Sequence, residues 1–426
     1  MKPYIKYRML FLLSFLFMAT SCSSELELFP EESISPSQLE SSDLPQLING
    51  VYNKSTVGIG NRFVDFDLLA NHLQATPLFA GDDVNFVRNR LSPTQTESWW
   101  LQLYEIVYNA NTSLEVIDGL EGDFNNERAT ALYLRGLAYY YLATRFGGVP
   151  LLPANTTEIV PRSSAADTWS FIVNDLTTAL PLAEDFSNQH FVSKDAIRAL
   201  AARVYLTQGN TSEAQNMAEA VITSAAGNFA LESEFASIFS KNGNQEVIFA
   251  LGNDPEELVR QYVTFNPNDH PVSGSQQFAP TDDIFNTLYD VADLRREATL
   301  IVFNGQNIVN KYTESTNMPV VVSRLAEMYL ISAEAQGYPA GNTRLDELRS
   351  IRGLGPNVAT DQDSFIDAIL DERQREFYAE GFYWYDLVRT GKAIERLENV
   401  TDQNQLLLPI PQREIDLAEL EQNPGY

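Results

Sequence analysis

The sequence predicts a mainly helical protein, in which tetratricopeptide-like helical hairpins form a scaffold and an irregular, loop-rich part binds a ligand. Three observations predict this fold class. Apolar residues recur at helical spacing from Ser98 to Leu120. Two later segments place a small residue three positions before a tyrosine, which favours close helix packing. A stretch dense in Gly, Pro, Asn and Asp lies between Gly227 and Asn317 and interrupts the helical pattern.

The N-terminus has the layout of a secretory signal peptide. Basic residues precede an apolar run of 11 residues, Met9 to Ala19, and small residues follow it. A run of that length is short for a membrane-spanning helix, which needs about 20 residues. The next residue is Cys22, the only cysteine of the chain. The pattern resembles a bacterial lipoprotein signal, so we expect cleavage after residue 21, lipidation of Cys22 and a spacer over residues 22–45. An ordinary signal peptide with an incidental cysteine, or a signal anchor, is the alternative.

Charge and composition limit the classes of partner. The chain carries 57 acidic and 29 basic residues, a formal net charge of −28. Such a surface repels phosphate backbones and anionic lipid headgroups, which argues against nucleic acid as a partner. Apolar residues make up 44% and aromatic residues 11% of the chain, enough for a sizeable core. We expect a globular body over residues 46–426.

The scaffold is predicted mainly over residues 98–226 and 318–392. Its first helices are expected at 98–120, 126–146 and 165–182 from their apolar periodicity. A third helical pair is expected at 320–336 and 344–354.

The helical hairpins are predicted from small residues that each precede a tyrosine by three positions. Gly136 stands three residues before Tyr139, and Ala202 stands three before Tyr205. A small residue on one helix lets the next helix approach, and the tyrosine ring fills the space beside it. Unrelated helix bundles can show the same spacing.

The part between residues 227 and 317 is expected to hold the ligand, because binding groups in a helical scaffold usually lie on loops. Within it, Val247 to Leu251 is a short apolar run that predicts a strand.

Seven short motifs occur in order along nearly the whole chain. They are a Trp100, Tyr104, Ile106, Ala110, Asn111 helix, RFGGVPL at 145–151, QEVIFAL at 245–251, DLRR at 293–296, RLAEMYLISAEA at 324–335, ERQREFYAEG with DLVRTG at 372–391, and LLPIPQREI with QNPGY at the end. In this order they resemble the motifs of the SusD/RagB family of Bacteroidetes outer-membrane lipoproteins. The chain departs from the family at Tyr383, where members usually carry an arginine.

The resemblance implies a nutrient-capturing lipoprotein on the surface of the outer membrane. Family members hold an oligosaccharide on stacking aromatic rings and deliver it to a SusC-like TonB-dependent transporter, without a cofactor or a covalent step. The family's sugar contacts lie in variable loops and cannot be transferred by motif. The candidate ligand-binding residues are therefore chosen by their position in or beside the predicted loops. Trp99 and Trp100 point about 100° apart around one helix, so we expect Trp100 in the core and Trp99 toward the ligand. The ligand-binding candidates are Phe86, Trp99, Tyr262, His270 and Phe278, with Phe265 as a further loop aromatic.

Other functions remain open at the level of sequence. A repeat-helix lipoprotein that binds a protein or peptide partner is the main alternative, and a bare concave helical groove would favour it. A lipid-anchored hydrolase would need two carboxylates that face each other across a cleft. Glu372 and Glu376 lie four residues apart, but neighbouring arginines favour a salt-bridge network. The three histidines are widely separated and show no metal-ligand spacing. We therefore expect a binding protein with no metal and no enzymatic activity.

Overall fold

The structure is a computed structural model that describes residues 38–60, 64–78, 89–224, 227–239, 244–252, 261–313 and 319–426. The predicted signal peptide, the lipidation site Cys22 and the candidate Phe86 lie outside the described residues. The side chain of Tyr262 does so too. Within the described part of the chain, no helix is both long and apolar enough to cross a membrane.

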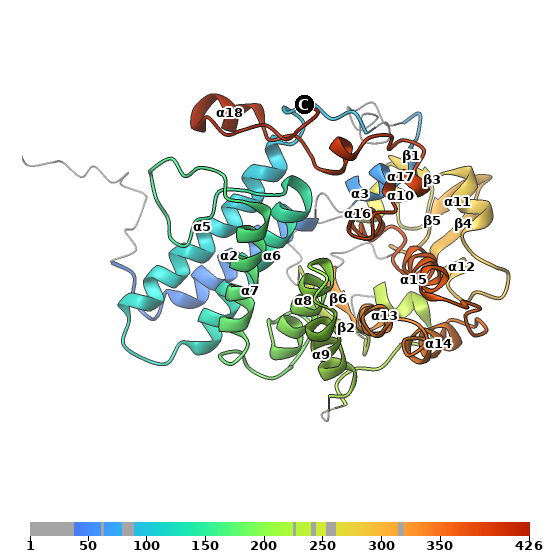
Figure 1. Cartoon of the computed structure of the whole chain (residues 1–426), viewed down its shortest axis with the longest axis horizontal. Helices are drawn as coiled ribbons and strands as arrows, with labels where there is room; N and C mark the ends of the chain where they lie inside the picture. The colour runs from blue at the N-terminus through green and yellow to red at the C-terminus, as the bar shows by residue number, and fades with distance from the viewer. Residues whose placement is uncertain are drawn as a thin grey trace, which may run out of the picture.

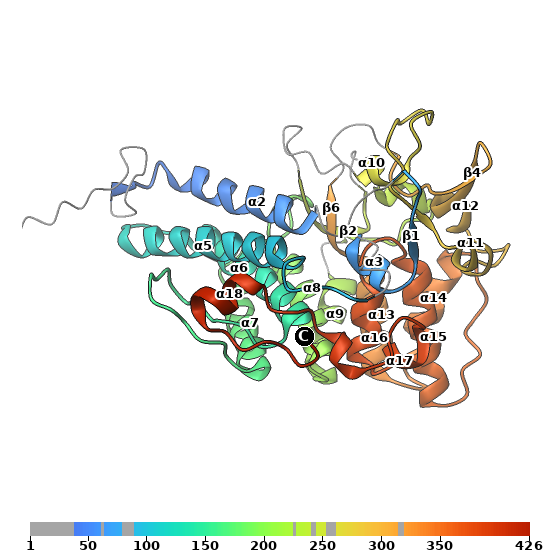
Figure 2. The same cartoon turned by 90° about the horizontal axis from the view of Figure 1, so that it is seen from above.

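Four helices of the N-terminal half pack neighbour against neighbour (Figure 1). They are α2 (Leu44–Gly60), α5 (Glu97–Gly119), α6 (Asn125–Phe146) and α7 (Ala165–Ala179). Figure 2 shows α2 and α5 lying side by side along the length of the molecule. The three helices expected here are confirmed, with ends that differ by at most three residues. The helix α2 was not predicted.

Close packing between α6 and α7 depends on Gly136, as predicted. A Cβ atom added at Gly136 would lie 3.5 Å from Leu176 Cδ2 of α7, so there is room for a methyl group and no more. The neighbouring Arg135 donates from Nε and Nη2 to the two carboxylate oxygens of Asp175, at 2.8 and 2.7 Å, and the pair is buried. Ser164 begins α7 because its side chain accepts a hydrogen bond from Asp167 N.

The second predicted hairpin consists of α8 (Lys194–Thr207) and α9 (Thr211–Ile222). Ser193 and Asn210 cap the two helices by accepting hydrogen bonds from backbone N–H groups of the first turn. Ala202 is fully buried, and so are Ala214 and Ala218 of α9, as the hairpin pattern requires.

The third helical pair differs from the prediction at its start. Residues Val320–Arg324 form a strand, β6, and the helix α13 begins only at Leu325 and ends at Gln336. Three consecutive valines favour a strand, and β6 pairs antiparallel with β2 (Val247–Leu251), the strand that the sequence predicted. The helix α14 (Asn342–Ile351) completes the pair, and α13 also packs against α9.

The stretch between residues 227 and 317 contains more regular structure than expected, in short elements. These are η2 (Phe235–Phe239), β2, α10 (Gln261–Phe265), β3 (Phe278–Pro280), α11 (Asp282–Thr287), α12 (Arg296–Thr299), β4 (Leu300–Phe303) and β5 (Gln306–Val309). Two elements from early in the chain join them, α3 (Asp65–Leu69) and β1 (Leu73–Ala75).

The chain ends with short helices and a tail that returns to the N-terminal half (Figure 1). The helices are α15 (Gln362–Glu376), α16 (Tyr383–Arg389), α17 (Ala393–Arg396), η3 (Gln403–Leu406) and α18 (Gln412–Ala418). In the tail, Asn423 donates to the carbonyl oxygens of Phe146 at 3.1 Å and Leu408 at 2.7 Å. Arg162 donates to Asn423 Oδ1 at 2.8 Å. The tail therefore supplies a hydrogen-bond donor to a backbone carbonyl group at the C-terminal end of α6.

Candidate functional site

The expectation that Trp99 faces a ligand is wrong. Its side chain is only 1% exposed and packs against the Phe66 ring, with ring centroids 5.0 Å apart. The guanidinium of Arg145 lies over the same indole at 5.0 Å. Trp100 is buried as predicted and meets Phe146 edge to face at 5.0 Å. Both tryptophans of the first turn of α5 are thus buried, one against Phe66 and the other against Phe146. Apolar periodicity within the helix could not predict this, because the covering residues belong to other segments.

Two loop candidates also lie in the interior. Phe278 is 2% exposed in β3, and the Phe265 ring stacks on Tyr312 with centroids 5.6 Å apart. Asn266, between them in sequence, is buried and donates from Nδ2 to the carbonyl oxygen of Val272 at 3.1 Å. These side chains support the loop from inside, so they are not surface contacts for a sugar.

His270 lies at the surface of this loop, half-buried, beside Phe303 of β4. The two rings meet edge to face with centroids 4.9 Å apart. Val272 N lies 3.1 Å and Val272 O lies 3.3 Å from His270 Nδ1, so this ring nitrogen is held against the loop backbone. Asn304 donates from Nδ2 to Asp269 Oδ2 at 2.9 Å and fixes the β4–β5 turn to the loop. We call His270, Phe303, Asp269 and Asn304 the His270 surface.

Phe303 is not among the residues that the sequence predicts for the site, although the turn that follows it has a recognisable sequence. Asn304 and Gly305 have φ values of 47° and 81°, which fit the Asn-Gly turn of a two-residue β-hairpin. The dipeptide stands between the apolar segments of β4 and β5. A hairpin there presents Phe303 at the end of its strand, next to the turn.

A short strand pair joins β1, from early in the chain, to β3, which follows the loop that carries His270. β1 pairs antiparallel with β3, from Leu73 opposite Pro280 to Ala75 opposite Phe278. Beyond the strands, Thr76 N donates to Gln277 O at 2.9 Å, and the Thr76 hydroxyl donates to Gln276 O at 2.6 Å. The strand β5 lies against β3, so the hairpin that carries Phe303 belongs to the same group of elements.

The His270 surface has the chemistry that a neutral sugar needs. An aromatic ring packs against the apolar C–H face of a sugar, and the hydroxyl groups at the rim need donors and acceptors. Phe303 and His270 supply rings, while Asp269 and Asn304 supply a carboxylate and an amide.

The acidic pair Glu372 and Glu376 serves a buried ionic network, as the sequence suggested. Glu372 pairs with Arg295 and Arg349, each at 2.7 Å. Burial alone would raise the pKa of Glu376, but the charges of three arginines outweigh it and hold that pKa well below its usual value. Both carboxylates are therefore engaged and charged near neutral pH, which does not suit a general acid.

His72 shows how a histidine of this chain is used inside the core. It is 1% exposed, with Nδ1 at 3.3 Å from Asp67 Oδ1 and Nε2 at 3.0 Å from Gln374 Nε2. Tyr383, the residue that departs from the family pattern, stacks on His72 with ring centroids 4.7 Å apart. Its hydroxyl accepts a hydrogen bond from Arg396 at 3.2 Å. The described residues contain no group of three His, Cys, Asp or Glu side chains that could hold a metal ion.

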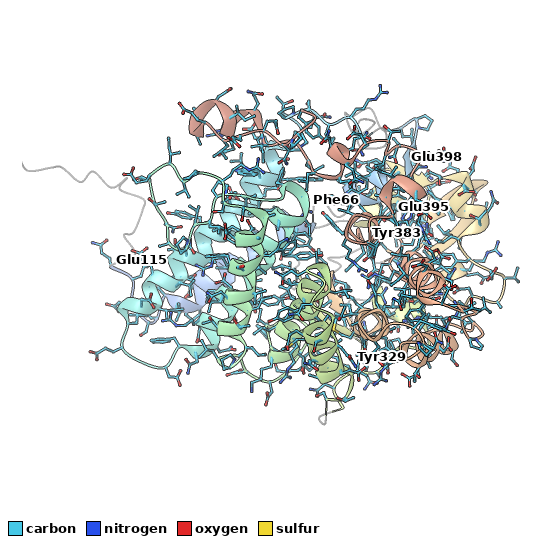
Figure 3. The ribbon with its side chains drawn as sticks, in the orientation of Figure 1. Phe66, Glu115, Tyr329, Tyr383, Glu395 and Glu398 are labelled. Atoms are coloured by element: carbon cyan, nitrogen blue, oxygen red, sulfur yellow. The ribbon has the colours of Figure 1, made fainter. Side chains whose placement is uncertain are left out.

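A separate open groove lies between α9, α13 and α14. The volume that the centre of a water-sized sphere can occupy in this groove is about 750 Å³. Tyr329, labelled in Figure 3, lines it together with Phe229 and Ile351, and Asp346 and Glu347 add negative charge. This is the kind of helical groove that the peptide-binding alternative requires.

Comparisons with known proteins agree with the motifs. The family model described as "Starch-binding associating with outer membrane" matches residues 35–206, and the one described as "SusD family" matches residues 302–426. SusD-like protein P38 of Formosa agariphila is 26% identical, over 95% of this chain and 96% of its own length.

Solved structures share the fold. One is a laminarin-binding SusD-like protein, with a TM-score of 0.80 and 23% identity, covering 91% of this chain and 100% of its own. Another is surface glycan-binding protein A from Bacteroides thetaiotaomicron, with a TM-score of 0.78 and 20% identity over 91% of this chain and 99% of its own. With two family models matched at the two ends, relatives along its whole length and this common fold, the chain belongs to the SusD/RagB family.

Proposed function

We propose that this protein is a cell-surface lipoprotein that captures oligosaccharides and delivers them to a SusC-like TonB-dependent transporter. Membership of the SusD/RagB family carries the proposal. Two structural neighbours support it, because one is described as laminarin-binding and the other as a surface glycan-binding protein. Binding without a covalent step is sufficient for this role.

We place the glycan on the His270 surface. A few aromatic contacts must offset the loss of freedom of a flexible oligosaccharide, so the dissociation constant should be on the order of micromolar to millimolar. Weak binding suits a protein that has to release its ligand to a pore. Selectivity then depends on which sugar hydroxyls find partners such as Asp269 and Asn304.

Affinity electrophoresis in gels that contain laminarin, or another neutral polysaccharide, tests the site. We expect Phe303→Ala and His270→Ala to lose most of the retardation seen with the unmodified protein. Phe191→Ala is the matched control, because Phe191 is an exposed aromatic residue, at 52%, in the segment before α8. Equal retardation of all three variants would place the glycan elsewhere.

The lipid anchor is a second part of the proposal. If Cys22 is acylated and becomes the new N-terminus, Cys22→Ala should leave the signal uncleaved by the lipoprotein pathway and release the protein from the outer-membrane fraction. Labelling with a palmitate analogue should fail for this variant. Labelling that persists would rule out Cys22 as the acylated residue.

The transporter is expected to contact the helical hairpins, while the loops at 80–98 and 253–283 face the ligand. Co-purification of the tagged protein with a SusC-like transporter tests this partnership. The groove beside Tyr329 supports a second candidate function, the binding of a peptide or protein partner. Substituting Tyr329 by Ala should weaken that contact and leave glycan retardation unchanged.

A further inference from the structure

We infer that the protein has a second, internal binding site for a small monocarboxylate, centred on Arg145. The site is a cavity between α3, α6, α8 and the segment that follows α15. We call it the aromatic cavity and define it by Phe66, Tyr140, Tyr141, Arg145, Arg203 and Phe382, with Glu380 at its wall. Phe66 lies near the middle of the molecule (Figure 3). The aromatic cavity is distinct from the His270 surface.

Arg145 is buried, and no carboxylate of the described residues forms an ion pair with it. Its side chain is 5% exposed, and within the described residues its guanidinium makes one hydrogen bond, from Nη1 to the carbonyl oxygen of Tyr141 at 3.2 Å. Its guanidinium carbon lies 4.6 Å from the centroids of both Phe66 and Tyr141, and 5.0 Å from that of Trp99. Its Nε has no acceptor among the described residues, and no carboxylate of these residues pairs with it. Rings attract a cation but do not accept its five N–H donors as a carboxylate does.

The other charged groups of the aromatic cavity are neutralised. Arg203 donates from Nε and Nη2 to the two oxygens of Glu327, at 2.6 and 2.7 Å. Glu380 accepts from Lys311 at 2.8 Å and from Arg324 at 2.9 and 3.1 Å. Among the described residues that line the aromatic cavity, Arg145 therefore keeps a positive charge without a carboxylate partner, and a buried charge is costly unless it is paired.

The size and the walls of the aromatic cavity define the ligand. It offers about 50 Å³ to the centre of a water-sized sphere. Since one water needs about 10–15 Å³ on this measure, the room suits a molecule of only a few heavy atoms. A single charge calls for a monoanion, and the planar fork of a guanidinium matches a carboxylate. The rings of Phe66 and Phe382 can pack against a short apolar group of the ligand, such as a methyl group.

Two tyrosine hydroxyls complete the recognition. Tyr140 and Tyr141 line the aromatic cavity, and the described residues give neither hydroxyl a hydrogen-bond partner. Burial raises the pKa of Tyr140 and of Tyr141, so both hydroxyls keep their protons and can donate to a carboxylate oxygen.

Saturation-transfer NMR with sodium acetate, on the full chain at constant sodium concentration, tests the site. We expect a saturable acetate signal and a dissociation constant at least about tenfold weaker in Arg145→Gln. Tyr141→Phe keeps the ring over Arg145 and removes only the hydroxyl, so it should fold normally and bind about tenfold more weakly. Arg413→Gln is the matched control, because Arg413 is 54% exposed on α18, and it should bind acetate as the unmodified protein does.

The outcomes distinguish a small free carboxylate from the carboxylate of a sugar acid. They also distinguish failure of the aromatic cavity from failure of the His270 surface. Acetate binding that is lost in both cavity variants supports a free monocarboxylate. Glucuronate that binds in place of acetate would overturn the size argument, and with it the proposal. Acetate binding that is absent, or equal in Arg145→Gln and Arg413→Gln, would leave Arg145 as a structural residue held by aromatic rings. Retardation by laminarin should be unchanged in every one of these variants, so failure of either proposal is seen independently.

Discussion

Arg352 holds Glu376 by two parallel hydrogen bonds, from Nε to Oε2 at 3.0 Å and from Nη2 to Oε1 at 2.8 Å, and both side chains are excluded from water. Arg324 contacts the same carboxylate and also donates to the Glu376 backbone oxygen at 2.6 Å. Arg295 reaches Glu376 Oε2 at 2.8 Å. The carboxylate of Glu376 is therefore the centre at which three arginines from different parts of the chain meet.

Removal of this charge should destabilise the fold strongly. Glu376→Gln removes the one carboxylate that all three buried arginines share and leaves them with only their other partners, such as Glu246 and Glu372, so we expect the free energy of unfolding in urea to fall by about 3–5 kcal/mol. Glu395→Gln is the control, since Glu395 is 63% exposed and its ion-pair partner within the described residues is Lys392 alone (Figure 3). That change should stay within about 0.5 kcal/mol. Similar urea midpoints for the two variants would mean that the network adds little to stability.

The same network predicts how stability depends on pH. The folded-state pKa of Glu376 lies well below its usual 4.5, and that of Glu372 is lowered as well. A carboxylate with a lowered pKa contributes stability above its unfolded-state pKa and loses it as the pH falls toward the folded-state value. The urea midpoint should therefore drop as the pH is taken below about 4.5. In Glu376→Gln this part of the pH profile should be flatter, and an unchanged slope would contradict the assignment.

Packing at Gly136 can be tested by side-chain size. A leucine there would push beyond the 3.5 Å contact with Leu176, so Gly136→Leu should cost about 1–3 kcal/mol through overpacking. Ala202→Leu, in the second hairpin, should behave in the same way because Ala202 is fully buried. Gly136→Ala is the control, since its methyl group fits. Thermal unfolding that is unchanged in both leucine variants would argue against tight hairpins.

Trp99 and Trp100 should now respond alike to substitution. Both are buried, so Trp99→Ala and Trp100→Ala should each lower the free energy of unfolding by about 3–5 kcal/mol, the cost of emptying a large core position. Neither should affect glycan retardation directly, provided that the proteins are compared below their unfolding transitions. A Trp99→Ala protein of normal stability that no longer binds glycan would restore the original expectation.

The long helices could be predicted because their apolar periodicity and caps are local. The same local reasoning predicted that Trp99 is exposed, which is wrong, because Phe66 and Arg145 cover it from other helices. Phe66 belongs to a five-residue helix without a clear pattern, and Arg145 is the last basic residue of α6. Local spacing around Glu372 indicated an ionic network, but it could not name Arg295, Arg324 or Arg352, which tertiary structure brings in.

The candidate site was predictable only in part. His270 is half-buried at the surface of its loop, where a ligand contact is still a prediction, whereas Phe265 and Phe278 turn inward and support the loop. In a loop, no periodicity tells which aromatic side chain faces the core. Phe303 joins His270 through a hairpin more than thirty residues away, a contact that only the β1–β3 and β4–β5 pairing defines.

The tail that closes α6 sets a condition on how the chain is made. Asn423 follows Phe146, whose carbonyl oxygen it binds, by 277 residues. At a synthesis rate of about 5–20 residues per second, the ribosome reaches Asn423 roughly 14–55 s after Phe146. During that interval the Phe146 carbonyl oxygen has the Arg162 guanidinium, at 3.1 Å, but not the Asn423 amide, and a chain cut short never receives that amide. Truncated chains therefore lack one of the two side-chain donors at this helix end, so the last residues made complete a contact that the first half of the chain cannot complete alone.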